Sequence, residues 1–278
     1  MFKKRQLLIA TKHGKEAVIE PLFRKEFKIN SFTSKLFDTD ILGTFSGEIS
    51  RKDDALTTLR KKCILGHEAT NCDLVIANEG SFGQHPTLFF TAADEEWVML
   101  KDFRNDLEIV AREITFETNF NGQSISSVAE LLEFSEKVHF STHGIILKSG
   151  GHNPIKIVKD NYSKATLLHN YSKLKQEYDT VFAETDMRAH RNPTRMKVIE
   201  KVTQNLIKKI KNCCPSCRIP GFDVVYVKPG LPCENCLYPT KSTLSHLYQC
   251  KKCKFQQEKI FPRGIKLEDA TYCDFCNP

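Results

Sequence analysis

The chain has 278 residues, of which 40% are hydrophobic, and its 41 Lys and Arg against 34 Asp and Glu give a formal charge of +7. This length suits one large domain, or a medium domain followed by a small one. The apolar run at residues 7–10 is too short for a secretory signal and no run is long enough to span a membrane, so we expect a cytoplasmic protein.

The first element is a short apolar run at residues 6–11, which predicts a buried strand, and the apolar spacing that follows it predicts a helix. The turn between them places Thr11, His13 and Lys15 at the carboxyl end of a strand and close to a helix N-terminus. Ligands of open α/β sheets bind there, and helix N-termini attract anions. We therefore predict that these three residues bind a ligand; the alternative is that Lys15 is an ordinary surface residue.

Residues 73–77 predict a second buried strand, and the nine residues after it, Asn-Glu-Gly-Ser-Phe-Gly-Gln-His-Pro, predict a loop with the composition of a site. Glu79 is a candidate metal ligand or base, His85 a candidate for proton transfer, and Ser81 a candidate ligand contact. Glycines in such a loop allow close approach of the backbone to a ligand. The alternative is a tight turn that needs glycine, with Glu79 in solvent.

Further strands are expected near residues 88–90, 96–100, 107–117 and 139–147, and helices near 50–64, 125–138 and 167–182. The fold class predicted is α/β, with a mixed sheet and flanking helices at residues 1–212 and a small zinc-ribbon domain at residues 213–278.

Residues 184–195 form a polar segment without periodicity that precedes a predicted helix, whose start is marked by Asn192 as N-cap and Pro193 as first residue. The segment also contains Asp186, a candidate metal ligand or base. Three further candidates for contact with a phosphorylated ligand are Arg188, His190 and Arg195. An ion-pair network that braces the helix start is the alternative.

Eight cysteines near the C-terminus occur as four C-x-x-C pairs, a spacing that lets both thiolates of a pair bind one metal ion. Two pairs complete one tetrahedral zinc site, so we predict two structural zinc ions, closed to water. The predicted ligands are Cys214, Cys217, Cys233, Cys236, Cys250, Cys253, Cys273 and Cys276.

Two pairings of these knuckles are open. In the sequential one, the first knuckle joins the second and the third joins the fourth. In the nested one, which we favour, the second joins the third across a hairpin predicted within residues 237–249, and the outer knuckles form the other site. The nested pairing also ties down Cys276, which otherwise lies on a fraying tail.

Three motifs together resemble a bacterial family of unknown function: Glu79-Gly-Ser-Phe-Gly with His85-Pro86, the segment from Glu184 to Arg195, and the four knuckles. The resemblance covers nearly the whole chain and implies no activity.

The first 120 or so residues also resemble inosine/xanthosine triphosphate pyrophosphohydrolases, through the run Leu8-Ile-Ala-Thr-Lys-His-Gly-Lys-Glu and the segment from Asp73 to Gly83. This resemblance implies phosphate binding by Lys15 and magnesium binding by Glu79. The sequence departs from that pattern at His13, where the family has asparagine, and Lys15 comes one residue early.

The leading hypothesis is that the α/β domain binds a nucleotide or nucleic-acid end and hydrolyses it with Mg²⁺ as a metal-dependent phosphohydrolase. Phosphoryl chemistry needs mainly positioning and charge neutralisation, which these residues supply. The rival hypothesis is a non-catalytic zinc-ribbon module that binds nucleic acid or a protein, supported by the strength of the zinc signal compared with every other motif. Separately, the basic residues clustered in the last third of the chain suit a polyanionic partner.

Overall fold

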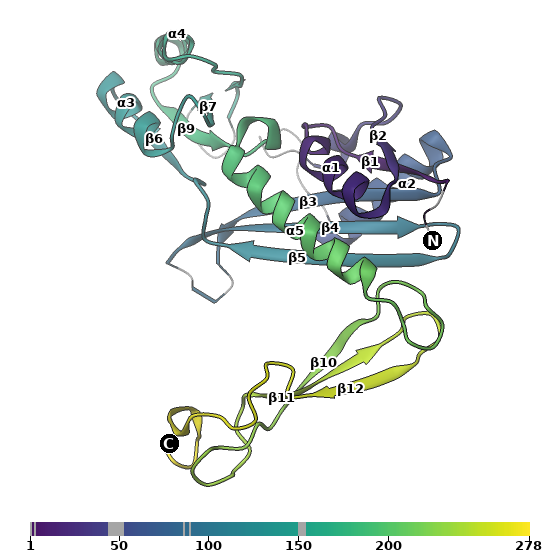
Figure 1. The fold of residues 1–278 in the computed structure, drawn as a ribbon. Helices are drawn as coiled ribbons and strands as arrows, with labels where there is room; N and C mark the ends of the chain where they lie inside the picture. Colours follow the sequence, from purple (N-terminus) through teal and green to yellow (C-terminus); the bar gives the residue numbers. More distant parts are fainter. Residues whose placement is uncertain (1, 3, 44–52, 86, 89, 150–153) are drawn as a thin grey trace. The chain divides into compact units, whose positions relative to one another are not determined.

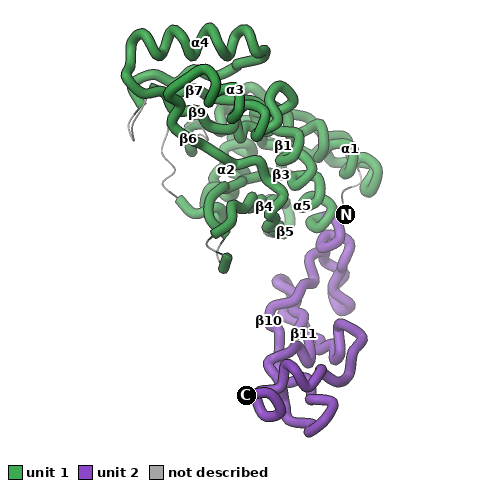
Figure 2. The backbone as a smooth tube through the Cα atoms, turned by 90° about the vertical axis from the view of Figure 1, so that its left-hand side faces the viewer, with its two compact units in different colours: residues 1–206 green, residues 207–278 purple. Residues whose placement is uncertain are grey.

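The structure is a computed structural model that describes residues 2, 4–43, 53–85, 87–88, 90–149 and 154–278. The chain divides into two compact units, residues 1–206 and 207–278, coloured separately in Figure 2. The division falls within a long helix, a few residues before the predicted boundary at 212. None of the helices in the described ranges combines the length and apolar character of a membrane span.

The first unit is built around a five-stranded mixed sheet with the strand order β2-β1-β3-β4-β5. β2, β1 and β3 run parallel to one another. β4 runs antiparallel to β3, and β5 runs antiparallel to β4. The strands are β1 (Gln6–Ala10), β2 (Asn30–Phe32), β3 (Leu74–Gln84), β4 (Ala92–Asp102) and β5 (Leu107–Thr115). The predicted strand–turn–helix at the start of the chain is β1 followed by α1 (Glu16–Phe27).

The prediction of a loop after Ala77 is wrong for most of its length, because β3 continues to Gln84 and pairs with β4 throughout. The two glycines suggested a turn, but pairing with β4 supplies every residue from Asn78 to Gln84 with a strand neighbour. Long-range pairing of this kind overrides local turn preference.

Helices cover both faces of this sheet. Helix α2 (Ala55–Thr70) packs Leu59 and Cys63 against Val75, Ala77 and Met99 on one face. Because side chains alternate along a strand, Asn78 and Glu96 point to the other face, where α5 (Pro193–Lys211) crosses β3, β4 and β5 beside α1 (Figure 1).

A second sheet in the same unit has the order β6-β9-β7-β8 and carries α3 (Val128–Lys137) and α4 (Lys164–Glu177) over one core. Its strands are β6 (Gly122–Ile125), β7 (Gly144–Ser149), β8 (Ile157–Val158) and β9 (Val181–Asp186). The predicted helix at 167–182 is therefore too long at its end, where β9 begins, and the predicted strand at 139–147 starts only at Gly144.

The start of α5 is as the sequence predicts. Pro193 is its first residue, and the side-chain oxygen of Asn192 accepts a hydrogen bond of 2.9 Å from the backbone N–H of Arg195. This bond satisfies one of the free donors of the first helical turn. It also fixes where the Arg195 side chain enters the sheet.

The second unit contains a three-stranded antiparallel sheet of the order β10-β11-β12. Its strands are β10 (Asp223–Pro229), β11 (Thr243–Gln249) and β12 (Gln256–Ile260). The hairpin predicted within residues 237–249 is wrong, because only the second half of that segment is a strand, β11, and it pairs with β10 and β12.

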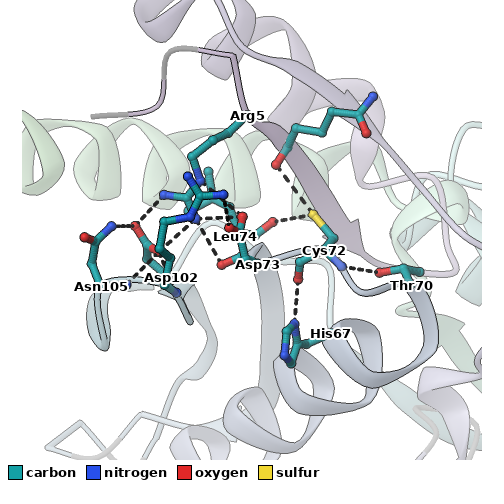
Figure 3. Close-up of polar contacts among 10 residues, drawn as sticks. Arg5, His67, Thr70, Cys72, Asp73, Leu74, Asp102 and Asn105 are labelled. Atoms are coloured by element: carbon teal, nitrogen blue, oxygen red, sulfur yellow. Dashed lines mark hydrogen bonds and ion pairs between the residues drawn. The ribbon is translucent and has the colours of Figure 1, made fainter.

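Arg5, just before β1, binds Asp73, just before β3, and Asp102, the last residue of β4, and so links three neighbouring strands at one end of the first sheet (Figure 3). Its guanidinium donates two hydrogen bonds, of 2.7 and 2.8 Å, to the carboxylate of Asp102, and a further one of 2.8 Å to Asp73. The side chain of Asp102 is fully buried and that of Arg5 is 5% exposed. A bidentate pair that is shielded from water in this way is costly to break from one side.

We predict that Arg5→Gln lowers the free energy of unfolding of the first unit by about 3 kcal/mol, because it leaves Asp102 buried without its counter-ion. The matched control is Arg104→Gln. Arg104 pairs with Asp73 at 2.6 Å, but its side chain is 63% exposed, so a loss below about 1 kcal/mol is expected. Urea unfolding of both variants measures the difference; equal losses would contradict the role given to burial.

Candidate metal centres and ligand site

Each of the four C-x-x-C pairs adopts the same type of local turn. In each knuckle the backbone N–H of the residue that follows the second cysteine donates to the carbonyl of the first cysteine: Arg218 to Cys214, Leu237 to Cys233, Lys254 to Cys250 and Asn277 to Cys273, at 2.8–3.0 Å. This turn brings both thiols of a knuckle to the same side. The local structure that the spacing predicts is therefore present four times.

The eight cysteines form two groups of four: Cys214, Cys217, Cys250 and Cys253, and Cys233, Cys236, Cys273 and Cys276. Within each group the sulfurs all lie within 4.8 Å of one another. Sulfur–sulfur distances between knuckles are 3.6 and 3.6 Å in the first group and 3.9 and 3.7 Å in the second. A tetrahedron with zinc–sulfur bonds of about 2.3 Å has edges of about 3.8 Å. Both groups could therefore hold zinc.

Both pairings considered from the sequence are wrong. The first knuckle joins the third and the second joins the fourth, so the two sites interleave along the chain.

The cause is the sheet. Strand β10 begins after the first knuckle and β11 ends before the third, and Asp223 pairs with Gln249, so these two knuckles meet at one end of the hairpin. Strand β12 pairs back along β11 to Ser245 and returns the chain to the other end, where the fourth knuckle meets the second.

Metal analysis of variants that carry two Cys→Ser substitutions tests which knuckles form a site together. The full chain is expected to contain about two zinc ions. Cys214→Ser with Cys250→Ser damages one site only and should leave one zinc. Cys214→Ser with Cys233→Ser damages both and should leave none, because a site with three sulfurs binds zinc far more weakly. The reverse result would contradict the interleaved arrangement.

A second candidate site lies in the first unit, where β1 ends. Pairing of β1 with β3 stops at Ala10 and Ala77, while β3 continues. Two lysines reach the part of β3 that β1 leaves uncovered. From α2, Lys62 contacts the carboxylate of Glu79 and the carbonyl of Asn78; from the start of α1, Lys15 donates a bond of 2.7 Å to the side-chain oxygen of Asn78.

The bond from Lys15 is the first link of a chain of buried polar contacts, which we call the buried network: Lys15, Asn78, Glu96 and Arg195. Asn78 donates to Glu96 at 2.7 Å, and Arg195 donates to the other oxygen of Glu96 at 2.6 Å. The side chains of Arg195 and Glu96 are fully buried. The network therefore links α1, β3, β4 and α5.

Asp94 lies beside this network on the same face of β4. It is 1% exposed, and neither carboxylate oxygen has a hydrogen-bond partner among the described residues. Burial, and then the negative charge of Glu96, raise the pKa of Asp94 to about 8, although Arg195 and Lys15 act in the other direction. This shift favours the neutral form of the carboxyl group.

Lys15 is 5% exposed, and its hydrogen-bond acceptor is a neutral amide. Burial, followed by the positive charges of Arg195 and Lys62, lowers the pKa of Lys15 well below 10.5, against the attraction of Glu96 and Glu79. An anion that came within reach of this amine would stabilise its charged form.

Four predicted residues come together here, because Thr11, His13, Lys15 and Glu79 line one narrow pocket of about 20 Å³, with Lys12, Asp40 and Lys62 also around it. A neighbouring hollow of about 430 Å³ shares Thr11 and Lys12 and extends to the carboxyl end of β2. It is also lined by Thr33, Ser34, Lys35 and Phe37 and by the acidic Glu16 and Asp38.

Of the residues predicted at 184–195, His190 lies beside this pocket. The rings of His13 and His190 are stacked with centroids 5.3 Å apart. Burial lowers the pKa of His13 to about 4, although Asp40 at 3.2 Å raises it. Asp186 and Arg188 are bound to each other, at distances down to 2.6 Å, and Arg188 also binds Asp160.

Two predicted residues lie away from the pocket. Ser81 donates to Glu95 at 3.2 Å, and His85 accepts from Thr87 and packs against Phe116. Sequence inspection also missed Asn78, Asp94 and Glu96. The only signal for the two acids was their spacing of two residues within Ala-Ala-Asp-Glu-Glu-Trp, which places both on one face of a strand.

Fold and cysteine groups together define a mixed α/β protein with a C-terminal module of two four-cysteine sites. Residues 62–278 match a family described as "Domain of unknown function (DUF6671)", and the chain belongs to this family. A search of curated proteins found no match.

Among solved structures the chain is similar to one titled "Crystal structure of protein VC0702 from Vibrio cholerae", with a TM-score of 0.36 and 9% identity over 75% of this chain and 96% of that chain. A likeness at this level carries no argument about fold or function. The comparisons add no support for the resemblance to inosine/xanthosine triphosphate pyrophosphohydrolases.

Gly80 makes the Glu96–Arg195 contact possible. It lies directly across from Glu96 in the sheet, and a Cβ atom there would meet Glu96 Oε1 at 2.3 Å and Arg195 Nη2 at 2.6 Å. We predict that Gly80→Ala lowers the free energy of unfolding by about 3 kcal/mol, because it forces the buried pair apart. Thermal or urea unfolding measures this loss.

The matched control is Gly83→Ala in the same strand, where a Cβ atom would meet nothing within 4 Å. We expect a change within about 0.5 kcal/mol. If both alanine variants were equally stable, the network would be looser than these contacts imply.

Proposed function

We propose that the first unit binds a phosphorylated, nucleotide-like ligand at the carboxyl ends of β1 and β2, and that the second unit is held by two structural zinc ions. The observation that carries the first part is Lys15, a buried amine that borders a pocket at a helix N-terminus and has a neutral amide as its acceptor. A phosphate oxygen would supply the missing negative charge.

The two adjoining cavities suit the two parts of such a ligand. The narrow pocket has room for about one water-sized group, such as a phosphate oxygen, beside Lys15. The larger hollow offers Thr33, Ser34 and Lys35 for further phosphates or a sugar, and Phe37 as an apolar residue. Lys12 also borders it, but its amine is bound to Asp38 and Asp40. Its volume of about 430 Å³ is within the range of small-ligand pockets.

The buried arginine has a different role from the one expected from the sequence. Arg195 is fully buried and bound to Glu96 and to the carbonyl of Met187. We propose that it positions the strands beneath the site and does not touch the ligand. Arg188, held between Asp186 and Asp160, is proposed to brace the wall that carries His190.

Hydrolysis of the bound ligand is the second candidate function, favoured by the carboxylate of Glu79 at the pocket wall. In the described ranges, the cysteine groups are the only sets of three or more metal-binding side chains found together. We therefore propose that Mg²⁺ enters with the phosphates of the ligand, as it does in many nucleotide sites. Glu79 would then orient the attacking water while Lys62 holds its carboxylate.

Calorimetric titration with inorganic phosphate, pyrophosphate and nucleoside mono-, di- and triphosphates, each with Mg²⁺, tests the binding. Lys15→Met is expected to weaken binding at least tenfold and to lower the free energy of unfolding by about 1–3 kcal/mol, because the buried side-chain oxygen of Asn78 loses its donor. Binding to the wild type should weaken as the pH rises from 6 to 9, since the bound anion favours protonated Lys15.

Lys25→Met is the control, since Lys25 is an exposed residue in the last turn of the same helix; it should bind normally. Failure of every ligand in the panel, or equal binding by Lys15→Met, would refute the site. Product formation that Glu79→Gln abolishes while binding persists would support hydrolysis, and binding without product would leave a binding protein.

A further inference from the structure

The two faces of the β10-β11-β12 sheet differ in chemistry. From the strand register, Tyr248, His246, Gln257 and Lys259 share one face, and Tyr226, Leu247 and Glu258 share the other. On the first face the rings of Phe222 and Tyr248 lie nearly parallel, with centroids 5.5 Å and planes 29° apart. Phe222 is buried, so the first face offers the half-buried ring of Tyr248 next to amide and amine groups.

This face is hollowed beside the first four-cysteine group. The hollow has a volume of about 310 Å³ and is lined by Asn212, Cys213, Phe222, Tyr248, Gln257 and Lys259. Glu258 also borders it, but its carboxylate is bound to Ser245 and Lys228. A cavity of this size, with an aromatic wall and side-chain amides, has room for a planar heterocycle.

Positive charge gathers at the same end of the second unit. The knuckles of the first four-cysteine group carry Arg218, Lys251, Lys252 and Lys254 next to their cysteines, and all four are exposed. Lys252 and Lys254 form no ion pair with any described residue. The knuckles of the other group carry the acidic Glu234 and Asp274 instead. The two ends of the unit are thus of opposite character.

The negative charge of two zinc–thiolate sites would offset only part of the positive charge of the second unit. Residues 207–278 contain 12 Lys and Arg and six Asp and Glu, a formal charge of +6. Each zinc bound by four thiolates contributes about −2, so two sites leave a net charge of about +2. The excess is concentrated at the end that holds the hollow.

We propose that this end of the second unit binds single-stranded nucleic acid, with a base against Tyr248 in the hollow and phosphates on Lys252, Lys254 and Lys259. Aromatic stacking beside a basic surface is the usual way in which proteins hold unpaired strands. The small hollow takes a single exposed base, which a duplex does not offer. This proposal is independent of the ligand site in the first unit.

Fluorescence anisotropy of the zinc-loaded full chain with labelled dT12, rU12 and a 12-base-pair duplex tests the proposal. At about 50 mM salt the single strands should bind more tightly than the duplex, and about 200 mM salt should weaken that binding roughly tenfold. Lys252→Glu with Lys254→Glu should weaken it at least tenfold. Tyr248→Ala should weaken it about tenfold by removing the stacking ring.

The matched controls are a tyrosine on the opposite face of the β10-β11-β12 sheet and a lysine beside the second four-cysteine group. Tyr226, which is 56% exposed on the opposite face, and Lys241, which pairs with Asp274, should tolerate Tyr226→Ala and Lys241→Glu without loss of binding. Zinc content checks that each variant is folded. Should Tyr248→Ala lose zinc, Tyr248→Phe, which keeps the ring, should bind normally, and Lys259→Glu should weaken binding at least fivefold.

No binding at 50 mM salt, equal binding of duplex and single strands, or equal losses from Tyr226→Ala and Tyr248→Ala would overturn the proposal. The first outcome would leave this face as a surface for a protein partner.

Discussion

The contact on which the first unit depends is the buried ion pair between Arg195 and Glu96. It places the N-terminal turn of α5 against β4, and Asn78 extends it to Lys15 at the start of α1. Buried pairs add little net stability, but breaking one from a single side is costly, so such a pair strongly disfavours alternative arrangements. Gly80 leaves room for this pair because it has no Cβ atom. Asn192 caps the helix from which Arg195 extends.

The same network leaves a charge imbalance that suits ligand binding. The raised pKa of Asp94 favours its neutral form, while the carboxylate of Glu96 binds Arg195 and the amine of Lys15 has an amide for its partner. On the opposite face of the strand, Glu79 is held by Lys62. Burial lowers the pKa of the Lys15 amine, and an anion bound at the end of β1 would raise this pKa by stabilising the charged form.

Local patterns in the sequence were sufficient for the first strand and helix, the start of α5 and the four knuckles, because each depends on residues within a few positions of one another. The pairing of the knuckles depends on β10, whose partner is some twenty residues away, and spacing alone does not show which strand it joins. Asn78 to Gln84 contained two glycines and suggested a loop, whereas Gly80 is there to make room for a guanidinium group. Asp94 and Glu96 lay in a run of charged residues typical of a surface, and they are buried because α5, almost 100 residues later, covers them.

The most direct test of this account is the pKa of Asp94, measured from its carboxyl ¹³C shift between pH 5 and 9.5, with the Asp94→Asn variant to assign the signal. A buried carboxyl group without a hydrogen-bond partner among the described residues, beside the charge of Glu96, predicts a midpoint near 8. A carboxyl group that is already ionised at pH 6 would show that water or a counter-ion reaches Asp94, and would contradict the buried network as the basis of the ligand site.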